Sequence, residues 1–211
     1  MRCKAIAKPG DVMGNAIRIA LLLVVSSGVF AGDYEDGLDA AMRNDYVEAA
    51  KFFKRAAEQG HAEAQLYLGM LYKEGKGLPK DDNESGNRFR KAAEQGSAEA
   101  QFNLGLMYYG GQGVPRDYVE SVKWYRLAAR QGNAYAQANL AHMYAEGLGV
   151  PKDEVRAHAW MSLSANSEDR AVADGAELLM NQLAARMTSQ RISDAQKIAK
   201  DCVANDYKDC D

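Results

Sequence analysis

Apolar and small residues recur along the chain with a period of 36 residues. The segments 60–95 and 96–131 are identical at 18 of 36 positions. A third copy begins at Gly132 and loses its regularity after Ser164, and residues 33–59 hold an earlier copy that lacks the central loop. Self-similarity at a fixed period of this length indicates a repeat array in which each unit is one supersecondary element.

Each unit reads as two helices separated by a glycine-rich loop. Apolar and small residues spaced three and four apart predict a first helix over residues 62–73. The G-K-G sequence at 75–77 ends it, because glycine readily adopts the left-handed conformation, and Pro79 keeps the helix from resuming. Asp81 is the expected N-cap of the second helix, with Glu84 completing a capping-box pair.

Small residues at fixed positions, such as Gly105 and Ala128, predict helices that pack closely together. Neither helix can bury its apolar stripe alone, so stacked neighbouring units are expected to bury it between them. We therefore expect an all-α solenoid of three to four units over residues 32–166, followed by a C-terminal helical cap and tail over residues 167–211.

The repeated pattern resembles a known family. It reads G-x-A-x-A-Q-x-x-L-G-x-x-Y-x-x-G-x-G-[LV]-P-x-D and is followed by Ala-Ala, as in the Sel1-like repeat, a relative of the tetratricopeptide repeat. The resemblance implies a right-handed α/α superhelix of antiparallel helix pairs that serves as a protein-interaction scaffold. The chain departs from the pattern in its shortened first unit, at Arg88, where Trp124 and Trp160 stand in later units, and at Ala141, where earlier units have glycine.

Residues 168–200 differ from the repeats. An apolar stripe there predicts a helix that caps the last unit, and the sequence at 187–190 predicts that this helix stops and a second one starts. The alternative is an amphipathic helix that docks onto another protein. The stripe consists of Ala171, Ala176, Leu178, Leu179, Leu183, Ala184 and Met187.

Residues 1–31 have the pattern of an export signal. Basic residues precede an apolar run that begins at Ile19, and Val29-Phe30-Ala31 fits a cleavage site after Ala31. A membrane anchor is the rival interpretation, but the run is shorter than the roughly 20 apolar residues that span a bilayer. We expect a periplasmic or secreted protein without stable membrane insertion after cleavage. Met1 and Met13 are both candidate start sites.

Two cysteines, Cys202 and Cys210, remain after such a cleavage. An even pair in an exported chain predicts a disulfide, which would hold the C-terminal tail in place. Two free thiols are the alternative. A redox-active pair is disfavoured because the spacing is not C-x-x-C.

The balance of charge narrows the classes of partner. The chain has 26 basic and 29 acidic residues, a formal net charge of -3, and therefore no overall positive field to attract nucleic acid.

The catalytic signatures of serine hydrolases, zinc proteases and phosphate-binding loops are missing. The three histidines, His61, His142 and His158, are too far apart in the sequence to suggest a metal site. We expect no cofactor.

The resemblance implies that the first helices line the concave face. Positions i, i+4 and i+7 of these helices vary between units, while the packing positions stay the same. We therefore expect a peptide-binding stripe there, and the alternative is an ordinary solvated face that varies without constraint. The stripe comprises Glu63, Tyr67, Met70, Glu99, Asn103, Leu106, Tyr135, Asn139 and His142.

The leading hypothesis is a non-catalytic scaffold or adaptor of the bacterial cell envelope that binds a protein or an extended peptide. The alternative is an exported repeat protein with β-lactamase-like or penicillin-binding activity. That group resembles this chain in its repeats but carries a disulfide in each one, whereas this chain has no cysteine between residues 4 and 201. Hydrolysis of a chromogenic β-lactam would discriminate between the two. The oligomeric state is not indicated by the sequence.

Overall fold

The computed structural model describes residues 32–205 together with Tyr207 and Cys210, so the expected export signal lies outside the described residues. Within the described part, all regular secondary structure is α-helical. A helical stretch over residues 32–42 comes first. It is followed by α2 (Tyr46–Glu58), α3 (Ala62–Glu74), α4 (Asp82–Glu94), α5 (Ala98–Gly110), α6 (Tyr118–Ala129), α7 (Ala134–Glu146), α8 (Glu154–Ser164), α9 (Arg170–Ala184) and α10 (Ser189–Ala204).

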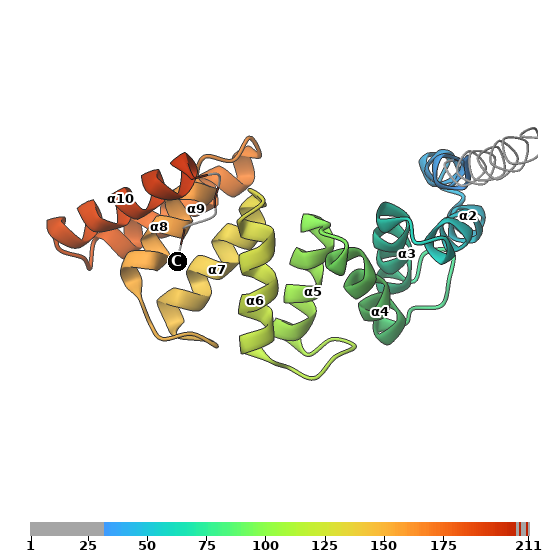
Figure 1. Ribbon diagram of the computed structural model, residues 1–211, viewed down its shortest axis with the longest axis horizontal. Helices are drawn as coiled ribbons and strands as arrows, with labels where there is room; N and C mark the ends of the chain where they lie inside the picture. The colour runs from blue at the N-terminus through green and yellow to red at the C-terminus, as the bar shows by residue number, and fades with distance from the viewer. Residues whose placement is uncertain (1–31, 206, 208–209, 211) are drawn as a thin grey trace, which may run out of the picture.

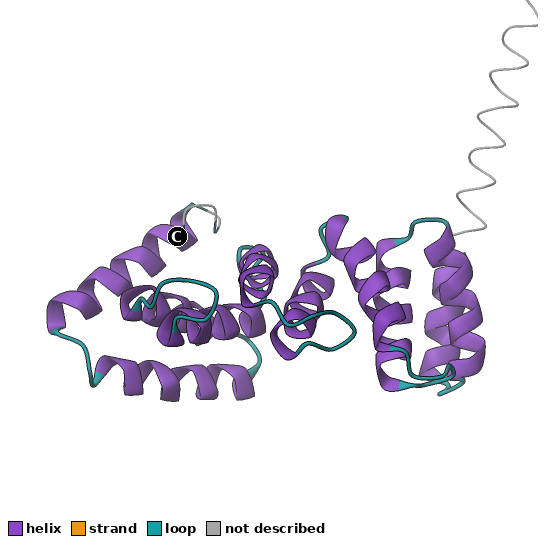
Figure 2. Cartoon of the chain, turned by 90° about the horizontal axis from the view of Figure 1, so that it is seen from below, coloured by secondary structure: helices purple, strands orange, loops and turns teal. Residues whose placement is uncertain are grey.

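The helices form an elongated array in which sequence neighbours are also neighbours in space (Figure 1). Helices α3 and α4, α5 and α6, and α7 and α8 form the antiparallel pairs, and the second helix of each pair packs on the first helix of the next. Figure 2 shows the same succession from below. The predicted all-α superhelix of antiparallel helix pairs is confirmed.

Residues at the helix ends explain why the helices begin and stop where they do. The Asp81 carboxylate accepts a hydrogen bond from the Glu84 N–H at 3.0 Å, as its N-cap role predicts. The second half of the expected capping box is wrong. The Glu84 carboxylate accepts hydrogen bonds from Arg88 instead, and the Asp81 N–H donates to the Tyr72 carbonyl at 3.0 Å. This backbone bond leaves no N–H at Asp81 for Glu84 to satisfy.

Small residues in the first helices make room for aromatic rings of the second helices. A Cβ atom on Gly69 would lie 2.8 Å from the Phe89 ring, and one on Gly105 would lie 2.6 Å from the Tyr125 ring. Gly37 has the same relation to Phe53. The expectation that small residues permit close packing is therefore confirmed at these positions.

The glycine-rich loops also connect one unit to the preceding unit. Gly113 has φ +66°, and a Cβ atom there would lie 2.1 Å from the Asp82 carbonyl oxygen at the start of α4. Gly77 and Gly149 make the same close approach to the starts of α2 and α6. Glycine is needed here both for its backbone angle and for the space that it leaves.

A glutamine ladder runs between units. The buried Gln101 side chain donates from Nε2 to the Ala93 carbonyl at 3.1 Å and accepts from Gln131 Nε2 at 2.8 Å. Gln65 and Gln137 donate to the equivalent carbonyls of their own neighbours. Each of these glutamines gives a carbonyl in the last turn of a helix a second hydrogen bond, besides the one from the N–H of the glycine that follows the helix.

The C-terminal helices end the array differently from the expected cap. Helix α9 ends and α10 begins near the predicted break at residues 187–190, and both helices pack on α8 (Figure 2). Only part of the expected stripe is buried, however. Ala176 and Leu183 are buried, whereas Ala171 is exposed and Leu178 and Leu179 are 61% and 46% exposed. The expectation that the α9 stripe closes the last apolar face is therefore wrong for those three residues, because α10 covers α8 from another side.

The predicted cysteine pair lies at this end of the molecule. Cys202 and Cys210 are both buried, and their sulfurs lie at bonding distance with the Cα atoms 4.7 Å apart. The oxidation state of the pair in the cell stays a prediction.

Candidate functional site

The expected binding stripe is accessible along the first helices α3, α5 and α7. Of its nine positions, Glu63, Glu99, Tyr135 and His142 are exposed, and the other five are half-buried: Tyr67, Met70, Asn103, Leu106 and Asn139. Accessibility is a requirement for binding and does not test it, so the binding role of the stripe stays a prediction.

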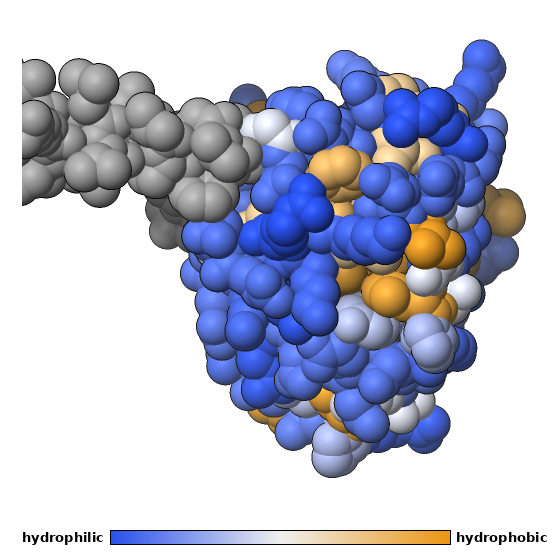
Figure 3. All heavy atoms as spheres, turned by 90° about the vertical axis from the view of Figure 1, so that its right-hand side faces the viewer, coloured by the Kyte–Doolittle hydropathy of each residue, from blue (hydrophilic) through white to orange (hydrophobic). Residues whose placement is uncertain are grey.

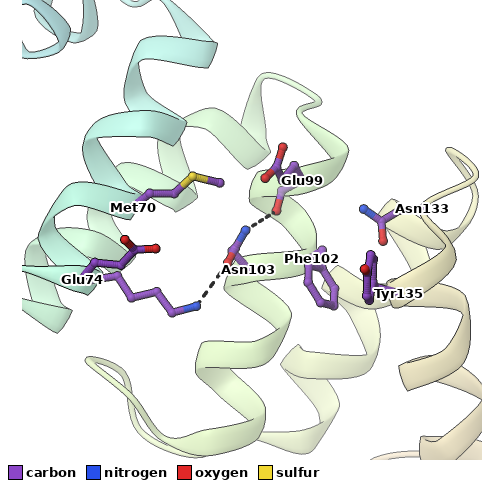
Figure 4. Close-up of a pocket in the computed structure, with 8 residues that line it drawn as sticks. Met70, Glu74, Glu99, Phe102, Asn103, Asn133 and Tyr135 are labelled. Carbon is purple, nitrogen blue, oxygen red and sulfur yellow. Dashed lines mark hydrogen bonds between the residues drawn. The ribbon is translucent and has the colours of Figure 1, made fainter. Parts of the chain in front are cut away.

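A central cleft of about 460 Å³ runs across the three first helices (Figure 4). Four stripe residues line it, namely Met70, Glu99, Asn103 and Tyr135. The sequence analysis missed the other four, which are Lys73, Glu74, Phe102 and Asn133. Glu74 continues the i, i+4, i+7 series by one more step, so a longer stripe would have included it. Nothing in the spacing distinguishes Phe102 from the buried Leu66, which occupies the same position in the preceding unit.

Hydrogen bonds order the polar side chains of the cleft. Lys73 Nζ donates to Asn103 Oδ1 at 3.2 Å, and Asn103 Nδ2 donates to the Glu99 carbonyl at 2.9 Å. In the next unit, Asn139 Nδ2 donates to the Tyr135 carbonyl at 2.8 Å. A carboxamide has two N–H donors and two acceptor lone pairs. Each of these asparagines therefore keeps hydrogen-bonding capacity that a peptide backbone can use.

Two aromatic rings form one wall of the cleft. The Phe102 and Tyr135 ring centroids are 5.8 Å apart. The Tyr135 hydroxyl donates to Asp169 Oδ2 at 2.7 Å, and this hydrogen bond raises the pKa of Tyr135 and lowers the pKa of Asp169. The bond fixes a ring that is 49% exposed, so an amphipathic surface is preorganised for contact.

Apolar hollows lie at both ends of the central cleft. One, of about 370 Å³, lies between residues 38–53 and α3, where Tyr67 stacks on Phe53 with ring centroids 5.3 Å apart. The other, of about 310 Å³, lies between α7 and α9 and is lined by Tyr135, Val172, Leu179 and neighbouring small residues. Apolar hollows on both sides of a polar cleft suit a ligand that carries apolar as well as polar side chains.

The remaining stripe residues are not brought into the central cleft. His142 lines a smaller hollow of about 140 Å³ between α7, α8 and α9, together with Arg186 and Leu183. Glu63, Leu106 and Asn139 line none of these four hollows. The stripe is thus one accessible row, of which the middle part forms the cleft.

The described residues contain no group of three or more His, Cys, Asp or Glu side chains placed to hold a metal ion. His61 stacks on Tyr34 with centroids 4.4 Å apart, His142 meets Tyr109 edge-on, and His158 is buried. Each histidine therefore has its own separate surroundings. Across residues 32–205, no helix is both long and apolar enough to span a bilayer.

Comparisons with known proteins agree with the architecture. The sequence model of the Sel1 repeat matches residues 30–61, 62–97, 98–133 and 134–169. A crystal structure of a Sel1 repeat protein from Oxalobacter formigenes is similar with a TM-score of 0.64 and 30% sequence identity, over 80% of this chain and 75% of that one.

A second similar structure is a protective antigen present in uropathogenic Escherichia coli strains and described as displaying an SLR fold. Its TM-score is 0.57 at 23% identity, over 87% of this chain, so this likeness concerns the fold alone. This chain spans about half of that protein, 48% of its length. No curated protein matches the sequence.

Proposed function

The chain belongs to the Sel1 repeat family, whose repeats typically form protein-interaction scaffolds, and we propose that it is a non-catalytic scaffold that binds an extended segment of another protein along α3, α5 and α7. The proposal rests chiefly on one observation, which is the cleft of about 460 Å³ built by three successive first helices. A cleft that crosses repeats offers one continuous surface to an elongated ligand.

Two features of the cleft support an extended peptide as its ligand. Asn103 presents its carboxamide in the cleft, and Asn139 presents one at the equivalent position of the next unit, on the same accessible row but outside the cleft. Tyr135 supplies a fixed, half-exposed aromatic surface, and aromatic residues dominate many binding interfaces. No nucleic acid partner is proposed, because a net charge of -3 gives no attraction for phosphates.

We place the scaffold in the bacterial cell envelope, either in the periplasm or outside the cell. The apolar run that begins at Ile19 and the small residues up to Ala31 support export. The Cys202–Cys210 geometry is compatible with a disulfide, which would persist in an oxidising compartment. Immunodetection of the protein in periplasmic and cytoplasmic fractions would test this placement.

The binding proposal is tested by capturing partners with residues 32–211 from an envelope extract. A variant with Asn103→Ala, Tyr135→Ala and Asn139→Ala removes the polar and aromatic contacts of the groove. We expect it to lose at least about tenfold in captured partner, since a truncated anchor residue costs more than about 1 kcal/mol.

The matched control carries Asn83→Ala, Asn87→Ala and Leu127→Ala, which replace exposed residues of the second helices α4 and α6. The control should retain the partner, and both variants should keep the helical circular dichroism of the parent. Equal capture by all three proteins would refute the groove as the binding surface.

A further inference from the structure

Charge is divided between the two rows of helices. The first helices of the four units, which are residues 32–42 and helices α3, α5 and α7, are each net acidic and together carry -7, and α9, which follows the last unit, carries -1. The second helices, α2, α4, α6 and α8, are each neutral or net basic and together carry +2, and α10 carries +1. The whole-chain charge of -3 hides this division.

Carboxylates stand within the groove itself. Glu74 of α3 and Glu99 of α5 line the central cleft from two sides (Figure 4). Glu146 lines the separate hollow between α7, α8 and α9, together with Arg186. Glu74 forms an ion pair with Lys76 at 2.7 Å, whereas Glu99 and Glu146 form none with the described residues 32–205. The lysine that lines the central cleft, Lys73, already donates to Asn103. Lys73 keeps its positive charge in this bond, so the residues that line the central cleft carry a net charge of -1, and Glu99 is its carboxylate without an ion pair to a described residue.

Acidic residues also gather at the N-terminal end of the groove. Burial raises the pKa of Tyr34, and the neighbouring Tyr67, Glu63 and Glu35 raise it further. Both glutamates therefore lie close enough to Tyr34 to act on it electrostatically. Figure 3 shows this end of the molecule as a largely hydrophilic surface interrupted by small apolar areas.

On the basis of the proposed function, we propose that the groove selects a basic extended segment of its partner, in which Lys or Arg residues alternate with apolar ones. The carboxylates of Glu74, Glu99 and Glu146 would face the cationic side chains. The hollows on either side of the cleft would take the apolar side chains. Complementary charge of this kind raises the association rate and excludes partners of the wrong sign.

The test uses two fluorescent peptides that differ only in whether their charged positions are Lys or Glu. Neighbouring helices are roughly 10 Å apart and an extended chain rises roughly 3.3 Å per residue, so peptides of about nine residues would span three helix spacings. Fluorescence anisotropy at low salt should show the Lys peptide binding at least about tenfold more tightly than the Glu peptide. The preference should shrink at about 1 M salt, where charges are screened within roughly 3 Å.

Charge-reversal variants locate the effect. Glu99→Lys with Glu146→Lys should weaken binding of the Lys peptide at least about tenfold. Each exposed ion pair between peptide and groove contributes up to about fivefold in affinity, and charge reversal replaces this attraction with repulsion. The matched control is Glu58→Lys with Glu94→Lys, which makes the same change of charge on the exposed last turns of α2 and α4. It should change the affinity by less than about threefold, since only the long-range field is altered.

Equal affinity for the two peptides, failure of the Lys peptide to bind, or an equal loss in the groove variant and the control would each overturn this inference. The proposed function would survive those results if the Asn103, Tyr135 and Asn139 variant still lost its captured partner. The proposed function alone would fail if the variant with Asn103→Ala, Tyr135→Ala and Asn139→Ala captured as much partner as the parent while the Lys peptide still bound in the groove.

Discussion

The contact between Gly105 and Tyr125 permits a sharp test of how the units are packed. Gly105 lies inside α5, and a Cβ atom there would be 2.6 Å and 2.7 Å from two carbons of the Tyr125 ring. The ring is fully buried, so it cannot swing away into solvent. Gly105→Ala would therefore add one methyl group at a place where the second helix must move.

Two opposing effects set the magnitude. Alanine is favoured over glycine in a helix by about 1 kcal/mol, and overpacking of a core costs about 1–3 kcal/mol. We expect Gly105→Ala to lower the free energy of unfolding by up to about 2 kcal/mol. Gly175→Ala is the matched control, because Gly175 lies inside α9 with nothing within 4 Å of its added Cβ. There only the helical preference acts, so a gain of about 0.5–1 kcal/mol is expected.

A compensating substitution separates steric overlap from other causes. The fourth unit has Ala141 at the position of Gly105 and Met161 at the position of Tyr125. A flexible side chain thus accompanies the larger residue. Combining Gly105→Ala with Tyr125→Met should be more stable than the sum of the two single effects by at least about 1 kcal/mol.

Urea unfolding followed by far-ultraviolet circular dichroism measures all four variants and the parent. With slopes of about 1–3 kcal/mol per molar urea, the expected differences move the midpoint by several tenths of a molar or more. The steric reasoning is refuted if Gly105→Ala is as stable as Gly175→Ala, or if the two substitutions at positions 105 and 125 are simply additive.

Two further predictions concern a loop and a buried base. Gly113→Ala should destabilise the fold more than Gly132→Ala in thermal melts. Both positions have positive φ, which costs about 1–2 kcal/mol, but only at Gly113 would the Cβ atom meet a backbone oxygen, at 2.1 Å. His158 is 3% exposed and burial lowers its pKa, so below about pH 6.5 the unfolded chain binds a proton that the folded chain resists. The free energy of unfolding should therefore fall with falling pH by up to about 1.4 kcal/mol per pH unit. Urea midpoints measured at pH 7.5 and 5.5 should differ less in His158→Leu than in the parent protein. In the exposed control His142→Gln, the difference should equal that of the parent.

Helix ends could be predicted from sequence because local residues determine them. Asp81 accepts from a helix N–H three residues later, and Gly75 takes φ +68° after the last turn of α3. Both effects involve only a few consecutive residues. The missing bond from Glu84 to the Asp81 N–H could not be predicted in the same way, because that N–H donates to the Tyr72 carbonyl of the preceding helix α3.

The candidate site was only partly predictable, because it depends on distances between units. The stripe positions are accessible, as helical periodicity predicts, but the cleft also includes Lys73 and Phe102. Likewise, the apolar spacing of α9 gave no sign that Leu178 would be left 61% exposed. Such outcomes depend on how α9 and α10 share the surface of α8.

The difference between fixed and variable positions has a structural cause in this chain. Gln101 is tied to a backbone carbonyl of the preceding unit and to Gln131 at the end of its own unit, so its replacement would remove both hydrogen bonds. Asn103, two residues later, bonds mainly within its own helix and with Lys73, so packing does not dictate its identity. The groove can therefore vary in chemistry while the array stays intact. A basic segment that binds the folded groove and not the unfolded chain should also stabilise the fold.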